Sequence, residues 1–220
     1  MLLLRRERSV WLWMLGLLLL SAYSAPQAQA QQRQAPVATL ANAVVEDDAN
    51  LDIELYVLVA SNNDTTEGGK LPNLLGPVVK QLRATLPFES YKLSTTMVNR
   101  VRNGGRLGVQ GVGPTPFSKV TAPSLLFSDY GIQSVKLKAD ASGQSLVELL
   151  GFKFGARIPI QTSTAQTGGP TAPVIQYEST GITTEFSLRE GEPVVVGTLN
   201  VGQTGESFIL IVTAKRAKEE

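Results

Sequence analysis

Cysteine and histidine are both absent from the 220 residues of this chain. Without cysteine there are no disulfides and no thiolate nucleophiles, and without either residue type there are no zinc sites built from them. A catalytic arrangement with a histidine base is excluded as well. An enzyme of this composition would depend on carboxylates, lysine, tyrosine or hydroxyl groups. We therefore expect no catalytic site, no cofactor and no metal ion.

The chain also lacks an excess of either charge and is poor in aromatic residues. Lysine and arginine number 20 and aspartate and glutamate 19, which leaves a net charge of +1. A chain with so little net charge offers no general attraction to nucleic acid, and we expect no nucleic-acid partner. Aromatic residues make up only 6% of the sequence, so aliphatic side chains must build the core.

The longest apolar run near the N-terminus covers 11 residues, 10–20, which is too short for a membrane-spanning helix of about 20 residues. Arg5, Arg6 and Arg8 precede this run, and small residues at Ala28 and Ala30 follow it. Positive charge, a short apolar run and an A-x-A site are the three parts of a secretory signal peptide. We therefore predict that residues 1–30 are a cleaved signal peptide rather than a membrane anchor, and that the protein is exported.

The next part of the chain predicts a leader, a strand and a helix. Residues 31–50 show no sustained period and predict a flexible leader. Residues 51–60 alternate with a period of two, and their second face becomes apolar toward the end, which predicts a central strand. After a polar loop, residues 71–86 repeat apolar side chains with the period of an amphipathic helix. Gly76–Pro77 interrupts this pattern and predicts a kink or a restart of the helix.

From residue 90 onward the pattern is almost entirely of strands. Residues 102–106 carry an Asn-Gly signal that predicts a tight hairpin between the first two strands of this part. We expect an α+β fold that is mainly antiparallel β, with one amphipathic helix packed on the sheet near the N-terminus. A strand-helix-hairpin unit would cover residues 51–115 and a β-rich unit residues 116–220. The predicted strands are 91–102, 107–112, 134–139, 146–154, 158–164, 174–179, 183–189, 194–200 and 207–215.

Several motifs invite a chemical interpretation. The glycines of Gly108–Gly113 spell G-x-x-G-x-G, which is not the dinucleotide fingerprint and is not followed by a helical pattern. Asp52 and Glu54 share a strand face at a spacing compatible with glycosidase carboxylates, and Asp47 and Asp48 are nearby. We favour a structural interpretation, in which these polar residues lie on the solvent-exposed face of a strand. Gly168–Pro170 marks a long hairpin loop.

Two groups of residues are candidates for an interaction surface. Arg100, Arg102 and Arg106 gather around the predicted turn at 102–106. The last strand is apolar on both faces, with Ile209 and Ile211 on the face opposite Phe208 and Leu210. Such a strand is either central in a two-layer core or covered by a partner, and the sequence leaves both options open.

Two motifs in the C-terminal half occur in a recognisable order. Residues 155–161 (GARIPIQ) are followed by a loop and by residues 174–182 (VIQYESTGI). Residues 184–198 (TEFSLREGEPVVVGT) then lead to the closing strand 207–215 (SFILIVTAK). In this order they resemble parts of the C-terminal core of the secretin family, the outer-membrane ring proteins of type II and type III secretion and type IV pili. The family's membrane strands are missing between Gly181 and Thr183.

The resemblance implies a shortened secretin-like core in a non-catalytic envelope protein. Such a protein would bind by edge-strand pairing or assemble with copies of itself, in the periplasm or at the outer membrane. Its partners would be proteins of the cell envelope. A different class is a secreted β-sandwich that presents its 102–106 turn or its Gly168 loop to a ligand. A third is a hydrolase that uses Asp52 and Glu54.

Overall fold

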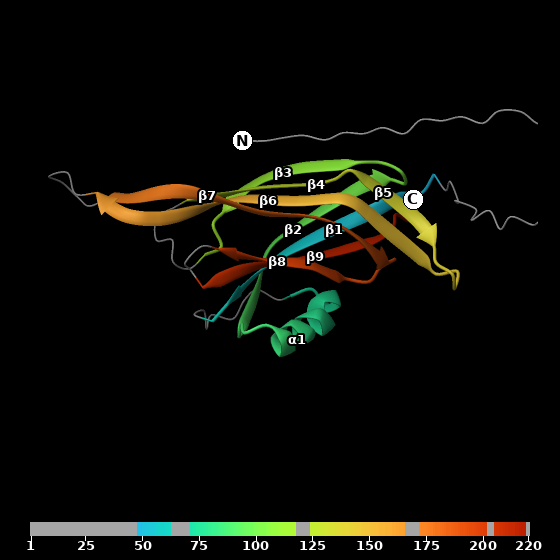
Figure 1. Cartoon of the computed structure of the whole chain (residues 1–220), viewed down its shortest axis with the longest axis horizontal. Coiled ribbons are helices and arrows are strands. Elements are labelled where there is room, and N and C mark those ends of the chain that lie inside the picture. The colour runs from blue at the N-terminus through green and yellow to red at the C-terminus, as the bar shows by residue number, and fades with distance from the viewer. Residues whose placement is uncertain (1–47, 63–70, 118–123, 166–171, 202–204, 219–220) are drawn as a thin grey trace, which may run out of the picture. The chain divides into compact units, whose positions relative to one another are not determined.

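The structure is a computed structural model in which residues 48–62, 71–117, 124–165, 172–201 and 205–218 are described, all within the compact unit Asn42–Glu220. The predicted signal peptide and residues 31–47 of the predicted leader lie outside the described residues. Nine strands, one 3-10 helix and one α-helix are formed by the described residues (Figure 1). They are β1 (Asn50–Ser61), η1 (Asn73–Leu75), α1 (Gly76–Thr85), β2 (Ser90–Arg102), β3 (Leu107–Pro114), β4 (Leu125–Ile132), β5 (Ser134–Ala139), β6 (Ser145–Ala165), β7 (Ala172–Arg189), β8 (Val194–Val201) and β9 (Glu206–Arg216).

The strands form two antiparallel sheets, and the first of them, sheet A, has the order β2-β1-β9-β8. β1 is a central strand, as its pattern predicts, because it pairs with β2 on one side and with β9 on the other. β9 lies between β1 and β8 and is buried along almost its whole length. The first and last strands of the described chain therefore build the middle of the same sheet.

The second sheet, sheet B, is organised around β6. β7 follows β6 along one side, while β4 and β5 lie end to end along the other. Gly151 adopts a positive φ of 60° where the partner of β6 changes from β5 to β4. β3 forms the edge beyond β4.

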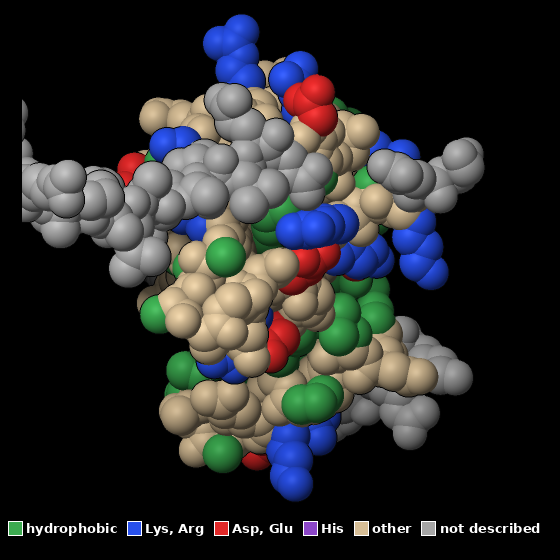
Figure 2. Space-filling view, turned by 90° about the vertical axis from the view of Figure 1, so that its right-hand side faces the viewer, with side chains coloured by type: hydrophobic (Ala, Val, Ile, Leu, Met, Phe, Trp, Pro, Cys, Tyr) green, Lys and Arg blue, Asp and Glu red, His purple; other side chains and the backbone are tan. Residues whose placement is uncertain are grey.

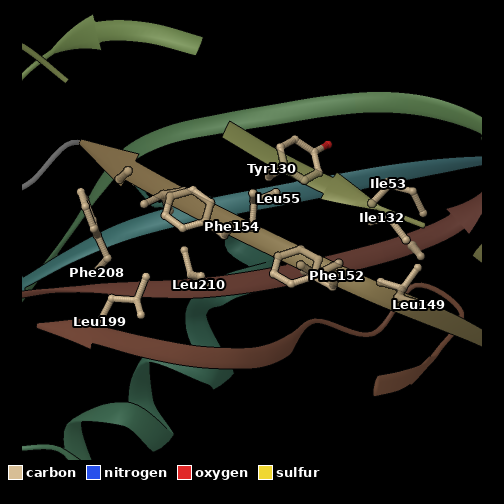
Figure 3. Close-up of a cluster of buried hydrophobic side chains, with 14 of the residues drawn as sticks. Ile53, Leu55, Tyr130, Ile132, Leu149, Phe152, Phe154, Leu199, Phe208 and Leu210 are labelled. Carbon is tan, nitrogen blue, oxygen red and sulfur yellow. The ribbon is translucent and has the colours of Figure 1, made fainter. Parts of the chain in front are cut away.

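The two sheets enclose the main core between them. Buried side chains from both sheets belong to one cluster, and the aromatic residues Phe152, Phe154 and Phe208 are among its largest members. Figure 3 shows these rings in one cluster with Ile53 and Leu55 of β1 and Tyr130 and Ile132 of β4. Most of the aromatic residues in the described ranges therefore lie in a core, where truncation of one phenylalanine costs about 3–5 kcal/mol.

Helix α1 covers part of the other face of sheet A (Figure 1). Leu75, Val79 and Leu82 pack on Ile209 and Ile211 in a second, smaller core. Pro77 lies in the first turn of α1, where its missing N–H has no intrahelical partner to lose. The predicted restart of the helix at Gly76–Pro77 is confirmed, with η1 ending where α1 begins.

The predicted fold class is confirmed, but the predicted hairpin between residues 91–102 and 107–112 is wrong. β2 and β3 do not form a hairpin, because they belong to different sheets. The backbone of the turn between them pairs with β5 instead: Gly104 donates to the carbonyl of Val135 over 2.7 Å, and Val135 donates to the carbonyl of Gly105 over 3.0 Å. The Asn-Gly pair therefore correctly indicated that the chain reverses here. It did not indicate which strand β3 pairs with.

The turn before β8 likewise connects two strands that belong to different sheets. β7 pairs with β6 in sheet B, whereas β8 pairs with β9 in sheet A, so β7 and β8 belong to different sheets. In the turn, Gly191 donates to the carbonyl of Ala214 over 2.8 Å, which ties it to β9. β6 and β7 are each one long strand, whereas the sequence pattern predicted two shorter strands in place of each. β4 was not predicted from the sequence.

The expected boundary near residue 115 does not separate two compact units. β1 and β2 lie in the same sheet as β8 and β9, and one core joins that sheet to β3–β7. Non-local strand pairing therefore merges the two predicted units into one.

Candidate interaction site

The carboxylates of Asp52 and Glu54 lie on the outer face of sheet A next to cations. Arg100 Nε is 2.8 Å from Asp52 Oδ1, and Lys215 Nζ is 2.9 Å from Glu54 Oε1. The hydroxyl of Tyr56 also donates to Glu54. The strand register explains this row, because β1 places Asp52 directly between Arg100 of β2 and Lys215 of β9.

The electrostatics of Glu54 do not suit a glycosidase general acid. The hydrogen bond from Tyr56, followed by the one from Lys215, holds the pKa of Glu54 below its ordinary value. A glycosidase general acid needs the opposite shift. Burial, together with the bond to Glu54, raises the pKa of Tyr56 to about 12. We conclude that Asp52 and Glu54 act as ion-pairing groups that hold neighbouring strands together.

Two of the three candidate arginines are engaged by carboxylates. Arg100 pairs with Asp52, and Arg102 Nη2 lies 2.7 Å from Asp48 Oδ1. Arg106 is exposed just before β3 begins. Figure 2 shows basic and acidic side chains next to one another on one end of the molecule. Asp48 is thus engaged by an arginine.

Ile209 and Ile211 are not accessible to a partner in this fold. Both side chains are fully buried in the core beneath α1. On the opposite face of β9, Phe208 and Leu210 pack against sheet B in the main core. Of the two options that the sequence left open for this strand, the structure has the central strand of a layered core.

The remaining motifs have simpler structural roles. Gly108–Gly113 lie in β3, which pairs with β4 along its whole length. Gly168–Pro170 and Asp47 lie outside the described residues. Across the described ranges no cluster of three or more potential metal ligands occurs, and no helix there has the length and apolarity needed to cross a membrane.

The β6–β7 hairpin has an outer part, the arm, made of Ile158–Ala165 and Ala172–Glu178. The predicted pairing of these two segments is confirmed, with Ile158 opposite Glu178 and Ala165 opposite Ala172. The register of β4 with β6 ends at Arg157, so within the described residues the arm pairs only with itself. Figure 1 shows the two strands reaching beyond the rest of sheet B. Sequence patterning missed that both strands continue into the sheet, because Gly155 and Gly181 resemble strand ends.

The base of the arm carries aromatic side chains on the outer face of sheet B. The rings of Phe127 and Tyr177 meet edge to face at 5.7 Å, and the Arg157 guanidinium lies 4.8 Å from the centre of the Phe127 ring. Tyr177 keeps 47% of its surface exposed. The sequence did not predict this cluster, because the cluster depends on β4, whose apolar residues occupy both strand faces.

No protein-family model matches the chain, and no curated protein matches it. Several solved structures do. The chain is similar to InvG, the secretin of the Salmonella SPI-1 type III secretion injectisome, with 10% identity over 78% of this chain and 66% of that chain, at a TM-score of 0.36. It is similar to PilQ, the type IV competence pilus secretin of V. cholerae, with 11% identity over 78% of this chain and 61% of that chain, at a TM-score of 0.34.

A third similar structure is the type II secretion system outer membrane complex of Klebsiella pneumoniae, with PulD, PulS and the PulC HR domain. Its identity is 12%, over 78% of this chain and 39% of that chain, at a TM-score of 0.31. The match covers less than two thirds of each of these three chains. Two of the three are secretins by name, the family that the sequence motifs resemble, but a likeness at such TM-scores supports no argument of its own.

Proposed function

We propose that this protein is a non-catalytic, exported envelope protein that acts by binding other proteins or by assembling with copies of itself. The signal-peptide pattern of residues 1–30 supports export to the periplasm or to the outer membrane. The surface that binds is the arm of β6 and β7. Its partner contributes a β-strand, either from another envelope protein or from a second copy of this chain.

The self-paired arm is the observation that carries this proposal. An isolated two-stranded ribbon is only marginally stable in water, and the arm extends beyond the strands that would support it. Its side chains include the half-buried Ile175 and the exposed Val174, whereas Ile158 and Ile160 at its start still lie in or against the main core. A ribbon with apolar side chains and unpaired backbone edges is a template for a further strand.

The sequence motifs point to the same part of the molecule. Residues 155–161 and 174–182, which resemble a strand pair of the secretin core, lie opposite each other in the arm and at its base. This coincidence supports a secretin-like role for the arm, in which one subunit or partner is joined to the next through strands.

Light scattering of the purified protein, together with co-purification from an envelope extract, tests the proposal. We expect the wild type to form a species larger than one chain or to retain an envelope protein. The double variant Val174→Lys, Gln176→Lys changes two exposed positions of the arm and should abolish this association while the chain stays folded. Val98→Lys, on the exposed face of β2, is the matched control and should leave the association unchanged.

Two results would overturn the proposal. The first is a wild type that stays monomeric at all concentrations and retains no envelope protein. The second is an association that survives the double arm variant.

A further inference from the structure

A hollow of about 390 Å³ opens on the outer face of sheet B. Its floor is formed where Gly155 of β6 lies opposite Gly181 of β7. Lys153 and Arg157 flank Gly155 along β6, and the hydroxyl residues Thr183 and Ser179 lie opposite them on β7. Cationic donors and hydroxyl groups therefore surround a floor without side chains.

Asp129 adds an acceptor to this hollow. It lies opposite Gly155 in the register of β4 with β6. Its carboxylate occupies the space above that glycine, since a Cβ added at Gly155 would lie 2.7 Å from Asp129 Oδ1. A glycine in the interior of a strand often marks the close approach of another group, and here that group is a carboxylate that faces the hollow.

An aromatic platform borders the hollow. Tyr177 precedes Ser179 by two residues on β7 and lies on the same face, about 7 Å away along the strand. Its edge-to-face contact with Phe127, which is itself covered by Arg157, holds the exposed ring in place. The platform and the hollow are thus neighbours that share Arg157.

We infer that this surface binds a glycan, with one pyranose unit in the hollow and a neighbouring unit on the ring of Tyr177. A pyranose carries hydroxyl groups around its edge that both donate and accept, as the mixed set of Asp129, Lys153 and the hydroxyl side chains requires. It also has an apolar face of C–H groups that stacks on an aromatic ring. A hydrogen-bonding site of this kind discriminates by leaving polar groups unpaired when the wrong ligand enters.

Other ligand classes fit less well. A phosphate or another small anion would meet the carboxylate of Asp129 as well as the two cations. An apolar protein surface would bury the charges of Lys153 and Asp129 without hydrogen-bond partners, which is costly. The inference goes beyond the proposed binding of protein strands. The hollow and the exposed ring of Tyr177 lie on the outer face of sheet B, whereas the arm, which includes Tyr177, would bind strands through its backbone edges.

The test is a nuclear magnetic resonance titration of the isotope-labelled, purified protein. The probes are chitotetraose and cellotetraose, with inorganic phosphate in a separate titration. We expect the backbone amide signals of Gly155 and Gly181 to shift and to saturate with at least one tetrasaccharide, and to be unaffected by phosphate.

Variants connect the binding to named side chains. Tyr177→Ala should weaken binding by about tenfold through the loss of stacking. Lys153→Gln should weaken it severalfold, whereas the matched control Lys136→Gln, an exposed lysine of β5 on the same face, should leave it unchanged. The double arm variant described above should also bind the tetrasaccharide normally, which separates this site from the proposed assembly.

Three outcomes would overturn the inference. One is the absence of shifts at both glycine amides with either tetrasaccharide. Another is a response to phosphate without a response to the sugars. The last is an equal loss of binding in Lys136→Gln and Lys153→Gln.

Discussion

The side-chain amide of Asn99 on β2 donates a hydrogen bond of 2.7 Å to the hydroxyl of Tyr130 on β4, and thereby joins sheet A to sheet B. Tyr130 is buried in the main core, so its hydroxyl has little access to water. We expect Asn99→Ala and Tyr130→Phe each to lower the free energy of unfolding by about 1 kcal/mol, measured by urea denaturation. In the double variant the two losses should be less than additive, because each single change already breaks the bond. Full additivity would mean that the bond contributes nothing.

Two buried tyrosines predict a loss of stability at alkaline pH. Burial raises the pKa of Tyr56 and of Tyr130 from 10.0 to about 12. The unfolded chain therefore ionises these groups near pH 10, while the folded chain keeps them neutral up to about pH 12. Their contribution is complete below pH 10 and is lost as the pH rises through this window. Tyr130→Phe and Tyr56→Phe should each flatten the decline of the urea midpoint, and an unchanged slope would contradict the assignment.

Glu54 predicts a loss of stability in acid. The bonds from Tyr56 and Lys215 lower its pKa below the ordinary 4.5, so its contribution is present above that pH and is lost as the pH falls through the folded-state value. We expect Glu54→Gln to reduce the acid dependence of the free energy of unfolding. Glu178→Gln, an exposed glutamate of β7, serves as the control and should not. Equal behaviour of the two variants would refute this role for Glu54.

The buried position of Ile211 beneath α1 predicts a strong response to charge. Ile211→Lys places a cation in the small core and should lower the free energy of unfolding by several kcal/mol. Val98→Lys, on the exposed edge strand of the same sheet, should change it by about 0.5 kcal/mol or less. Thermal unfolding followed by circular dichroism compares them. If Ile211→Lys folded as stably as Val98→Lys, the helix would not cover this face.

Gly181 predicts a steric requirement in the middle of β7. A Cβ at this position would lie 2.6 Å from the carbonyl oxygen of Phe154, so the two strands would have to move apart. We expect Gly181→Ala to cost about 1–3 kcal/mol in urea denaturation. Gly108→Ala, in β3, has no atom within 4 Å of the added Cβ and should be nearly neutral. Similar costs at both glycines would argue against the close approach of β6 and β7.

Local patterns predicted the central elements well. The period of two in β1 correctly assigned Ile53 and Leu55 to the main core, and the apolar second face correctly indicated a central strand. The helical period correctly indicated an amphipathic helix, and Gly76–Pro77 correctly indicated an interruption, but α1 begins at Gly76 and not at residue 71. These features follow from side-chain direction and backbone chemistry within a few residues, so the sequence contains them directly.

The sequence by itself determined that this chain builds antiparallel strands, one amphipathic helix and a last strand apolar on both faces. Only the tertiary structure decided which strands pair, because a turn such as Gly104–Gly105 reverses the chain without choosing the sheet that follows. It also decided that α1 covers Ile211, and it brought Asp129, Lys153 and Gly181 together from three strands to form the hollow. Such arrangements depend on the pairing of segments far apart in the sequence, which no local period encodes.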